Sequence, residues 1–116
     1  MVLSTVRVPL VVDGFYDEEF ETGEIPLGTP TVIVEVIKCH GSTKLRGVYS
    51  AVTDISAYVS DECIRLFSIW RYNGVQYDEV SVVMIGGTYI FVDRGTEEAK
   101  SLVALFNMVG DVRYGG

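Results

Sequence analysis

The architecture of this chain follows from the segment Val80-Ser-Val-Val-Met-Ile-Gly-Gly-Thr-Tyr-Ile-Phe-Val92. Both of its halves are rich in β-branched and aromatic residues, which favour strands, and Gly86-Gly87 between them suits a tight turn. A two-residue turn places Ile85 opposite Thr88 and puts apolar pairs on both faces of the hairpin. We therefore predict an antiparallel hairpin that lies inside a sheet.

A helix is expected directly after this hairpin. Thr96 is a suitable N-cap, and Glu97 and Glu98 place negative charge at the positive end of the helix dipole. Gly110 is suited to end the helix. Between these limits, apolar residues recur at the spacing of one helical face, at Ala99, Leu102, Val103, Phe106 and Val109.

Three strands are expected before this region. Thr31 to Cys39 is almost continuously apolar and β-branched, as in a central strand that is covered on both faces. His40 to Thr43 supplies turn residues, and Lys44 to Val52 is the return strand. Val6 to Val12 is also rich in strand-forming residues, but its Pro9 cannot donate a hydrogen bond to a ladder and therefore suits a sheet edge.

The segment from Asp61 to Tyr72 permits two interpretations. Polar residues recur in it every three positions and apolar residues fill the rest, so we predict a helix with a narrow polar stripe. Such a helix has both flanks apolar, and we expect it to be covered by other layers or by a second subunit. The alternative is a strand followed by a hairpin at Asn73-Gly74, a pair that favours tight β-turns.

These elements predict one α+β domain that spans all 116 residues. Their order is strand, strand, strand, helix, strand, strand, helix. Short hairpins between the strands imply a mainly antiparallel sheet of about five strands, covered by two helices. We expect a loop over residues 13–30 and a short flexible tail over residues 111–116.

Charge is distributed unevenly along the chain. The net charge of −7 arises from 16 acidic against 9 basic residues, and six of the acids fall between residues 13 and 24, where there is no Lys or Arg. The segment from Lys38 to Arg46 carries three bases and no acid. We expect the acidic loop, with its aromatic residues, and the basic hairpin tip to bind partners. The candidate binding residues are Phe15, Tyr16, Asp17, Glu18, Glu19, Phe20, Glu21, Lys38, His40, Lys44 and Arg46.

The sequence contains few of the residue patterns that are typical of catalytic sites and of cofactor-binding sites. His40 is the one histidine, and it cannot act with Cys39 in an extended strand, where neighbouring side chains point to opposite faces. We expect Cys39 and Cys63 to be reduced and to serve in packing. The spacings typical of metal sites and of phosphate-binding loops are missing, so we expect neither a metal nor another cofactor.

The leading hypothesis is a small non-enzymatic protein-interaction domain that self-associates as a dimer and binds a basic protein partner through the acidic loop. The alternatives are a small enzyme that uses Cys63 or His40 with a carboxylate, and a ligand-binding regulatory sensor domain. A small acidic domain without motifs is also compatible with a viral accessory protein. The chain begins without the pattern of a secretory signal, so a cytoplasmic location is expected. The acidic balance argues against nucleic acid as a partner, and every apolar run is too short to span a membrane.

Overall fold

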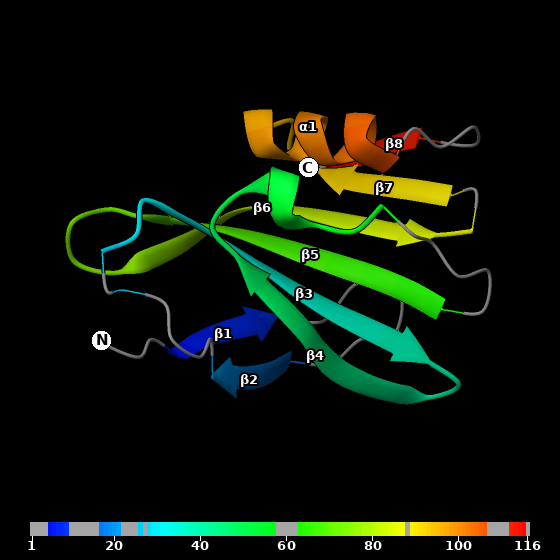
Figure 1. Ribbon diagram of the computed structural model, residues 1–116, viewed down its shortest axis with the longest axis horizontal. Helices are drawn as coiled ribbons and strands as arrows, with labels where there is room; N and C mark the ends of the chain where they lie inside the picture. Colours follow the sequence, from blue (N-terminus) through cyan, green and yellow to red (C-terminus); the bar gives the residue numbers. More distant parts are fainter. Residues whose placement is uncertain are drawn as a thin grey trace.

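The computed structural model describes residues 5–9, 17–21, 26, 28–57, 63–87, 89–106 and 112–115. A six-stranded sheet with the strand order β4-β3-β5-β6-β7-β8 forms its centre, and β1 and β2 form a separate two-stranded sheet (Figure 1). The elements are β1 (Thr5–Pro9), β2 (Asp17–Glu21), β3 (Thr31–Cys39), β4 (Ser42–Tyr49), the 3-10 turn η2 (Val52–Asp54), β5 (Cys63–Tyr72), β6 (Tyr77–Gly86), β7 (Tyr89–Asp93), α1 (Glu97–Phe106) and β8 (Val112–Gly115).

Five of the six central strands pair antiparallel in the order β4, β3, β5, β6 and β7, and β8 pairs parallel to β7. The prediction of a mainly antiparallel α+β domain is therefore confirmed. The prediction of two helices is wrong for the described residues, which contain the single α-helix α1.

The segment expected to be a helix from Asp61 to Tyr72 contains β5, and the alternative interpretation is the correct one. Successive side chains of β5 enter two different cores, with Leu66 on one face and Phe67 on the other. A strand that is buried on both faces has no polar face, and its apolar run resembles that of a buried helix. The hairpin after β5 is also present, but Tyr72 pairs with Tyr77, so its loop has the four residues 73–76 rather than the two-residue turn expected at Asn73-Gly74. The Asn73 side chain accepts hydrogen bonds from the backbone amides of Val75 and Gln76 within this loop.

The predicted β6–β7 hairpin is confirmed, with a different register. Ile85 pairs with Ile90 rather than with Thr88, and Gly86 pairs with Tyr89. The register is thus displaced by two residues, so the turn begins at Gly87 instead of Gly86. Because side chains alternate with a period of two, this displacement leaves every side chain on the face that was expected.

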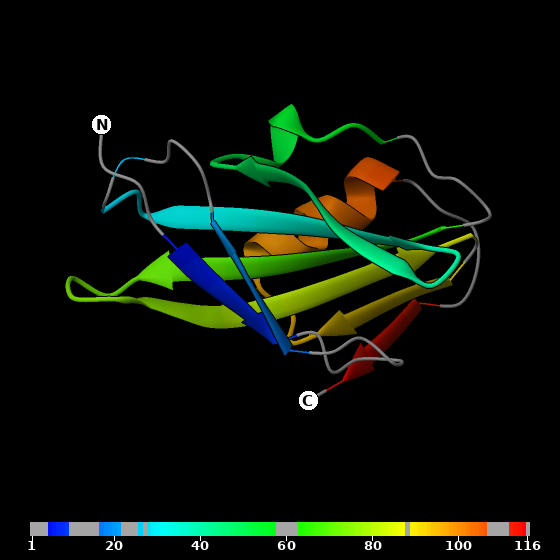
Figure 2. The same ribbon diagram turned by 90° about the horizontal axis from the view of Figure 1, so that it is seen from below.

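The six-stranded sheet lies between two layers. Helix α1 and η2 cover one face, and the β1–β2 hairpin lies across the other (Figures 1 and 2). The helix-side core contains Phe67, Val83 and Leu102 among its buried members, whereas the core on the opposite face contains Val34, Leu66 and Met84. The central strand β3, predicted to be covered on both faces, contributes to both cores.

Helix α1 begins as predicted. The Thr96 hydroxyl accepts a hydrogen bond from the backbone amide of Ala99 at 3.2 Å, which is the geometry of an N-cap. Ala99, Leu102 and Phe106 are buried against the sheet. Val109 and Gly110 lie outside the described residues.

Both terminal segments differ from expectation. The predicted loop over 13–30 contains β2, which pairs antiparallel with β1 from Pro9 opposite Asp17 to Thr5 opposite Glu21. A strand is possible in such an acidic segment because the main-chain ladder of a hairpin does not depend on side-chain hydrophobicity. The tail expected over 111–116 contains β8, which is paired with β7.

Candidate functional site

The basic segment forms the tip of the β3–β4 hairpin, as predicted. His40 and Gly41 occupy the two turn positions with φ of 50° and 83°, as a type I′ turn requires. The Ser42 hydroxyl donates to the carbonyl oxygen of Cys39 at 2.9 Å and closes the turn. Lys38 and Lys44 lie on the two strands next to this turn.

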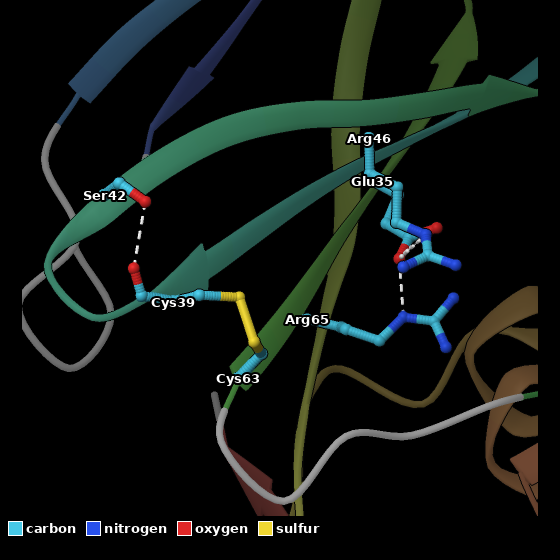
Figure 3. The surroundings of a disulfide bond; sticks show 6 residues. All are labelled: Glu35, Cys39, Ser42, Arg46, Cys63 and Arg65. Atoms are coloured by element: carbon cyan, nitrogen blue, oxygen red, sulfur yellow. Dashed lines mark hydrogen bonds and ion pairs between the residues drawn. A yellow bond between two sulfur atoms is a disulfide. The ribbon is translucent and has the colours of Figure 1, made fainter.

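A disulfide joins this hairpin to the centre of the sheet. Cys39 of β3 and Cys63 of β5 are directly opposite each other, and their sulfur atoms are bonded (Figure 3). The Cα atoms are 4.5 Å apart, the usual spacing of a non-hydrogen-bonded antiparallel pair. The expectation of two reduced cysteines is therefore wrong. That expectation followed from the cytoplasmic location and from the presence of two cysteines only, and the helix expected over residues 61–72 gave no register that would bring them together.

A buried ionic cluster lies on the helix side of the same three strands. The carboxylate of Glu35, which is fully buried, accepts a hydrogen bond from Arg65 Nε at 2.5 Å through Oε2. Its other oxygen accepts from the Tyr49 hydroxyl at 2.8 Å. Arg46 Nε lies 3.4 Å from Oε2. Because β3 runs between β4 and β5, Glu35 receives partners from both neighbouring strands (Figure 3).

Two backbone features make this arrangement possible. Glu35 pairs with Gly47, whereas the next residue of β3 pairs with Leu45, so Arg46 is the extra residue of a β-bulge. Bulges redirect side chains, and this one places the Arg46 guanidinium beside Glu35. A Cβ atom at Gly47 would lie 2.5 Å from the Tyr49 hydroxyl oxygen, so glycine is needed for the phenol to reach Glu35.

The cluster is held further by aromatic rings. The Arg65 guanidinium carbon lies 5.3 Å from the ring centre of Phe67 and 4.9 Å from that of Phe106, within the range of cation–π contacts. Phe106 belongs to α1, so this contact ties the helix to the sheet. Burial raises the pKa of the Tyr49 hydroxyl, and its hydrogen bond to the Glu35 carboxylate raises it further.

The arrangement of this cluster suits a structural role rather than catalysis. Glu35 is sealed from solvent, and two arginines compensate its charge, so the carboxylate has no room to act on a substrate. The disulfide bond removes Cys63 as a thiolate nucleophile, which leaves the proposed Cys63 enzyme without its reactive group. Within the part of the chain that the structure describes, no group of three or more His, Cys, Asp or Glu residues is placed to hold a metal ion.

The predicted binding residues fall in separate places. Asp17 to Glu21 form β2, and Phe15 and Tyr16 lie outside the described residues. Lys38, His40 and Lys44 lie at the hairpin tip, but Arg46 turns toward the ionic cluster. Sequence reasoning missed Glu35, Tyr49 and Arg65. The available signal was a single Glu within the apolar segment 31–39, which calls for a buried partner.

The chain has no match among known protein families, curated proteins or solved structures. Among the described residues, no helix has the length and apolar character that crossing a membrane would need.

Proposed function

We propose that this protein is a binding domain that self-associates through the edge of its main sheet. The binding edge is β4, and the strand that it receives is β2 of a second copy. One observation carries the proposal: β4 and β8 are the two edge strands of the described six-stranded sheet, and β4, with eight residues against four, offers the longer open edge (Figure 1). An edge strand presents unpaired amide and carbonyl groups, which are a template for adding a strand.

Opposite charges support β2 as the added strand. β2 has the sequence Asp17-Glu-Glu-Phe-Glu21, with four carboxylates in five residues, and it too has one described neighbour, β1. Lys44 lies exposed on β4, next to the basic tip. Lysine on an edge strand disfavours association with neutral or basic strands, so it selects for an acidic one. Two reciprocal β4–β2 contacts would close a two-fold dimer.

Contacts with the interior of the sheet hold β4 in an ordered conformation. Glu35 anchors β4 through Tyr49 and Arg46, and the disulfide fixes the base of the hairpin to β5. A strand that is already ordered loses little conformational entropy when it binds, which favours association.

The test is the molar mass in solution, measured by sedimentation equilibrium at several protein concentrations. In the β3–β4 hairpin, Cys39 and Ser42 flank a two-residue turn, so the amide of Thr43 is directed to the open edge. Thr43→Pro removes this donor and is expected to convert the dimer to a monomer. Lys44→Glu is expected to weaken association, whereas Lys100→Glu, on the exposed side of α1, is the matched control and should change little.

A second set of variants tests the acidic strand. In this set Asp17 is changed to Asn, and Glu18, Glu19 and Glu21 are changed to Gln, which removes four charges from β2 and keeps side chains of similar size. Association should weaken in this variant, and the wild-type dimer should weaken at high salt. A monomer at every concentration, or a dimer that is unaffected by both sets of variants, contradicts the proposal.

The disulfide also bears on where the protein works. Disulfides persist in oxidising compartments and are rare in the reducing cytosol. The bond between Cys39 and Cys63 therefore supports an oxidising site of action over the cytoplasmic one expected from the sequence. Alkylation of thiols at the moment of cell lysis, followed by mass spectrometry, tests this: unmodified, disulfide-linked cysteines are expected, and two alkylated cysteines would contradict it.

A further inference from the structure

A second polar cluster lies on the sheet face opposite α1. Four buried polar atoms there have no hydrogen-bond partner: Ser68 Oγ, Trp70 Nε1, the Tyr77 hydroxyl oxygen and Glu79 Oε2. Ser68 and Trp70 are 0% and 8% exposed. Native proteins leave very few buried polar groups without partners, so four in one region call for an explanation.

The register places these side chains together. Trp70 of β5 is directly opposite Glu79 of β6, and Tyr72 is directly opposite Tyr77. Ser68 precedes Trp70 by two residues, so the two side chains point to the same face. We call Ser68, Trp70, Tyr72, Tyr77 and Glu79 the β5–β6 cluster.

Aromatic rings form the wall of the β5–β6 cluster. The ring centres of Tyr72 and Tyr77 lie 5.1 Å apart, and the Tyr72 hydroxyl donates to the carbonyl oxygen of Gly74 at 3.0 Å. Trp70 and Tyr77 both pack against the core on this face. Tyr72 is thus held by its ring contact and by its hydroxyl group, whereas Trp70 Nε1 and the Tyr77 hydroxyl oxygen have no hydrogen-bond partner.

Negative charge is concentrated beside these rings. Asp93 of β7 is opposite Val82 of β6 and therefore shares the face of the β5–β6 cluster. A bulge at Val80 lets Glu79 take its place across from Trp70. The pKa of the Glu79 carboxyl is raised to about 7, chiefly by burial and also by the nearby Asp93 carboxylate, against a smaller lowering by Arg94.

These groups specify the chemistry of a ligand. A carboxylate next to a second carboxylate, with aromatic faces beside it, favours an organic cation. The hydroxyl groups of Ser68 and Tyr77 can accept hydrogen bonds from an ammonium group, but Trp70 Nε1 can only donate and needs an oxygen acceptor. A ligand with both an ammonium group and an oxygen can pair with the Glu79 carboxylate and accept from Trp70 Nε1 at the same time.

We propose that the β5–β6 cluster is a binding site for a small amino alcohol, whose ammonium group pairs with Glu79 and Asp93 and whose oxygen accepts a hydrogen bond from Trp70 Nε1. Tyr72, Tyr77, Glu79 and Asp93 are each partly exposed, so the site reaches the surface at this end of the sheet. The β1–β2 hairpin lies across the same face (Figure 2). This site is separate from the β4 edge and does not depend on self-association.

Trp70 provides a direct readout because it is the one tryptophan of the chain. The experiment titrates ethanolamine into the protein at about pH 8, where the Glu79 carboxyl is ionised, and follows tryptophan fluorescence. Saturable change is expected with ethanolamine. Sodium chloride at equal ionic strength and ethylene glycol, which lacks the charge, are the control titrants and should give no saturable change.

Variants then assign the effect to the site. Glu79→Gln and Asp93→Asn should each weaken ethanolamine binding about tenfold or more, because each removes a charged partner. Tyr77→Phe should weaken binding less, since it removes a single neutral hydroxyl group. Glu97→Gln on the exposed first turn of α1 is the matched control and should leave binding unchanged.

Two titration results would contradict this binding site. If ethanolamine gives no saturable change, or the same change as the control titrants, water alone satisfies the four atoms and the proposal is wrong. Equal affinity of the wild type and Glu79→Gln would overturn it as well. If Glu79→Gln does not fold, Asp93→Asn and Tyr77→Phe decide the question by the same measurement.

Discussion

Glu35 is the residue on which most of the helix-side arrangement depends. A fully buried carboxylate is costly unless each of its oxygens has a partner, and here Arg65 and Tyr49 supply one to each. Such a cluster contributes little net stability relative to apolar residues of the same size. It makes other pairings of β3, β4 and β5 costly, because any other register would leave a buried charge without its partners.

Replacing one partner of this cluster should be more damaging than replacing both. Arg65→Leu leaves the Glu35 charge buried and should lower the free energy of unfolding by about 3–5 kcal/mol. The double variant Glu35→Leu with Arg65→Leu should recover much of this loss. Urea denaturation of the wild type, both single variants and the double variant measures the coupling; equal additive losses would contradict the account of a mutually dependent pair.

Glu79 should make stability depend on pH. Its folded pKa of about 7 exceeds the ordinary value of 4.5, so the folded state binds more protons than the unfolded state between these values. Stability should therefore fall as pH rises from about 4.5 to about 7 and then level off, by on the order of 1 kcal/mol once partial exposure is allowed for.

Glu79→Gln isolates this effect from the other titrating groups. The variant retains a similar shape but does not titrate, so it should gain stability relative to the wild type as pH rises through this window. Asp93 and Arg94 are unchanged in both proteins and cancel in the comparison. Thermal denaturation at a series of pH values gives both curves, and parallel curves would show that Glu79 titrates normally.

At the scale of single elements, the sequence predicted the helix with distinct apolar and polar faces and the strands that are rich in β-branched residues. Helix α1 has an apolar face and a polar face, and its cap and buried face were predicted correctly. The strands β3, β6 and β7 were recognised from their β-branched residues and turns. β5 has only two β-branched residues, Ile64 and Ile69, and it is buried from Arg65 to Trp70, so neither its composition nor its periodicity distinguishes a strand from a helix.

The start of α1 should depend on its cap. Thr96→Ala removes the hydroxyl that accepts from the Ala99 amide, and it should reduce the free energy of unfolding by about 1 kcal/mol. Ser101→Ala, an exposed position within the same helix, is the matched control and should leave stability unchanged or slightly increased. Equal effects of the two substitutions would show that the cap does not contribute.

The candidate sites were harder to predict than the elements because they depend on the register between strands. Cys39 and Cys63 are 24 residues apart in sequence and meet only because β5 pairs with β3. The same is true of Glu35 with Arg65 and of Trp70 with Glu79. Once one strand is taken for a helix, none of these pairs follows from the sequence.

For the whole molecule, the disulfide should account for a large part of stability. It closes a loop with a sequence separation of 24 residues, for which the loss of chain entropy in the unfolded state corresponds to about 3 kcal/mol. Cys39→Ser with Cys63→Ser should shift the urea midpoint downward, and reduction of the wild type should give a matching shift. Circular dichroism should stay native-like without denaturant, because the β3–β5 ladder has further pairs; an unfolded variant would contradict this.

The same bond gives the chain a closed covalent ring. The ring begins at Cys39, passes through β4 and η2 and closes at Cys63. A peptide bond cut within β4 or η2 therefore releases no fragment, since both new ends stay attached to one molecule. Protease treatment that nicks this region should leave the intact mass plus one water in non-reducing mass spectrometry, and two fragments should separate only after reduction. β4, the strand proposed to bind a second copy, lies within this ring. A cut in β4 therefore breaks the strand but leaves both of its parts attached to the molecule.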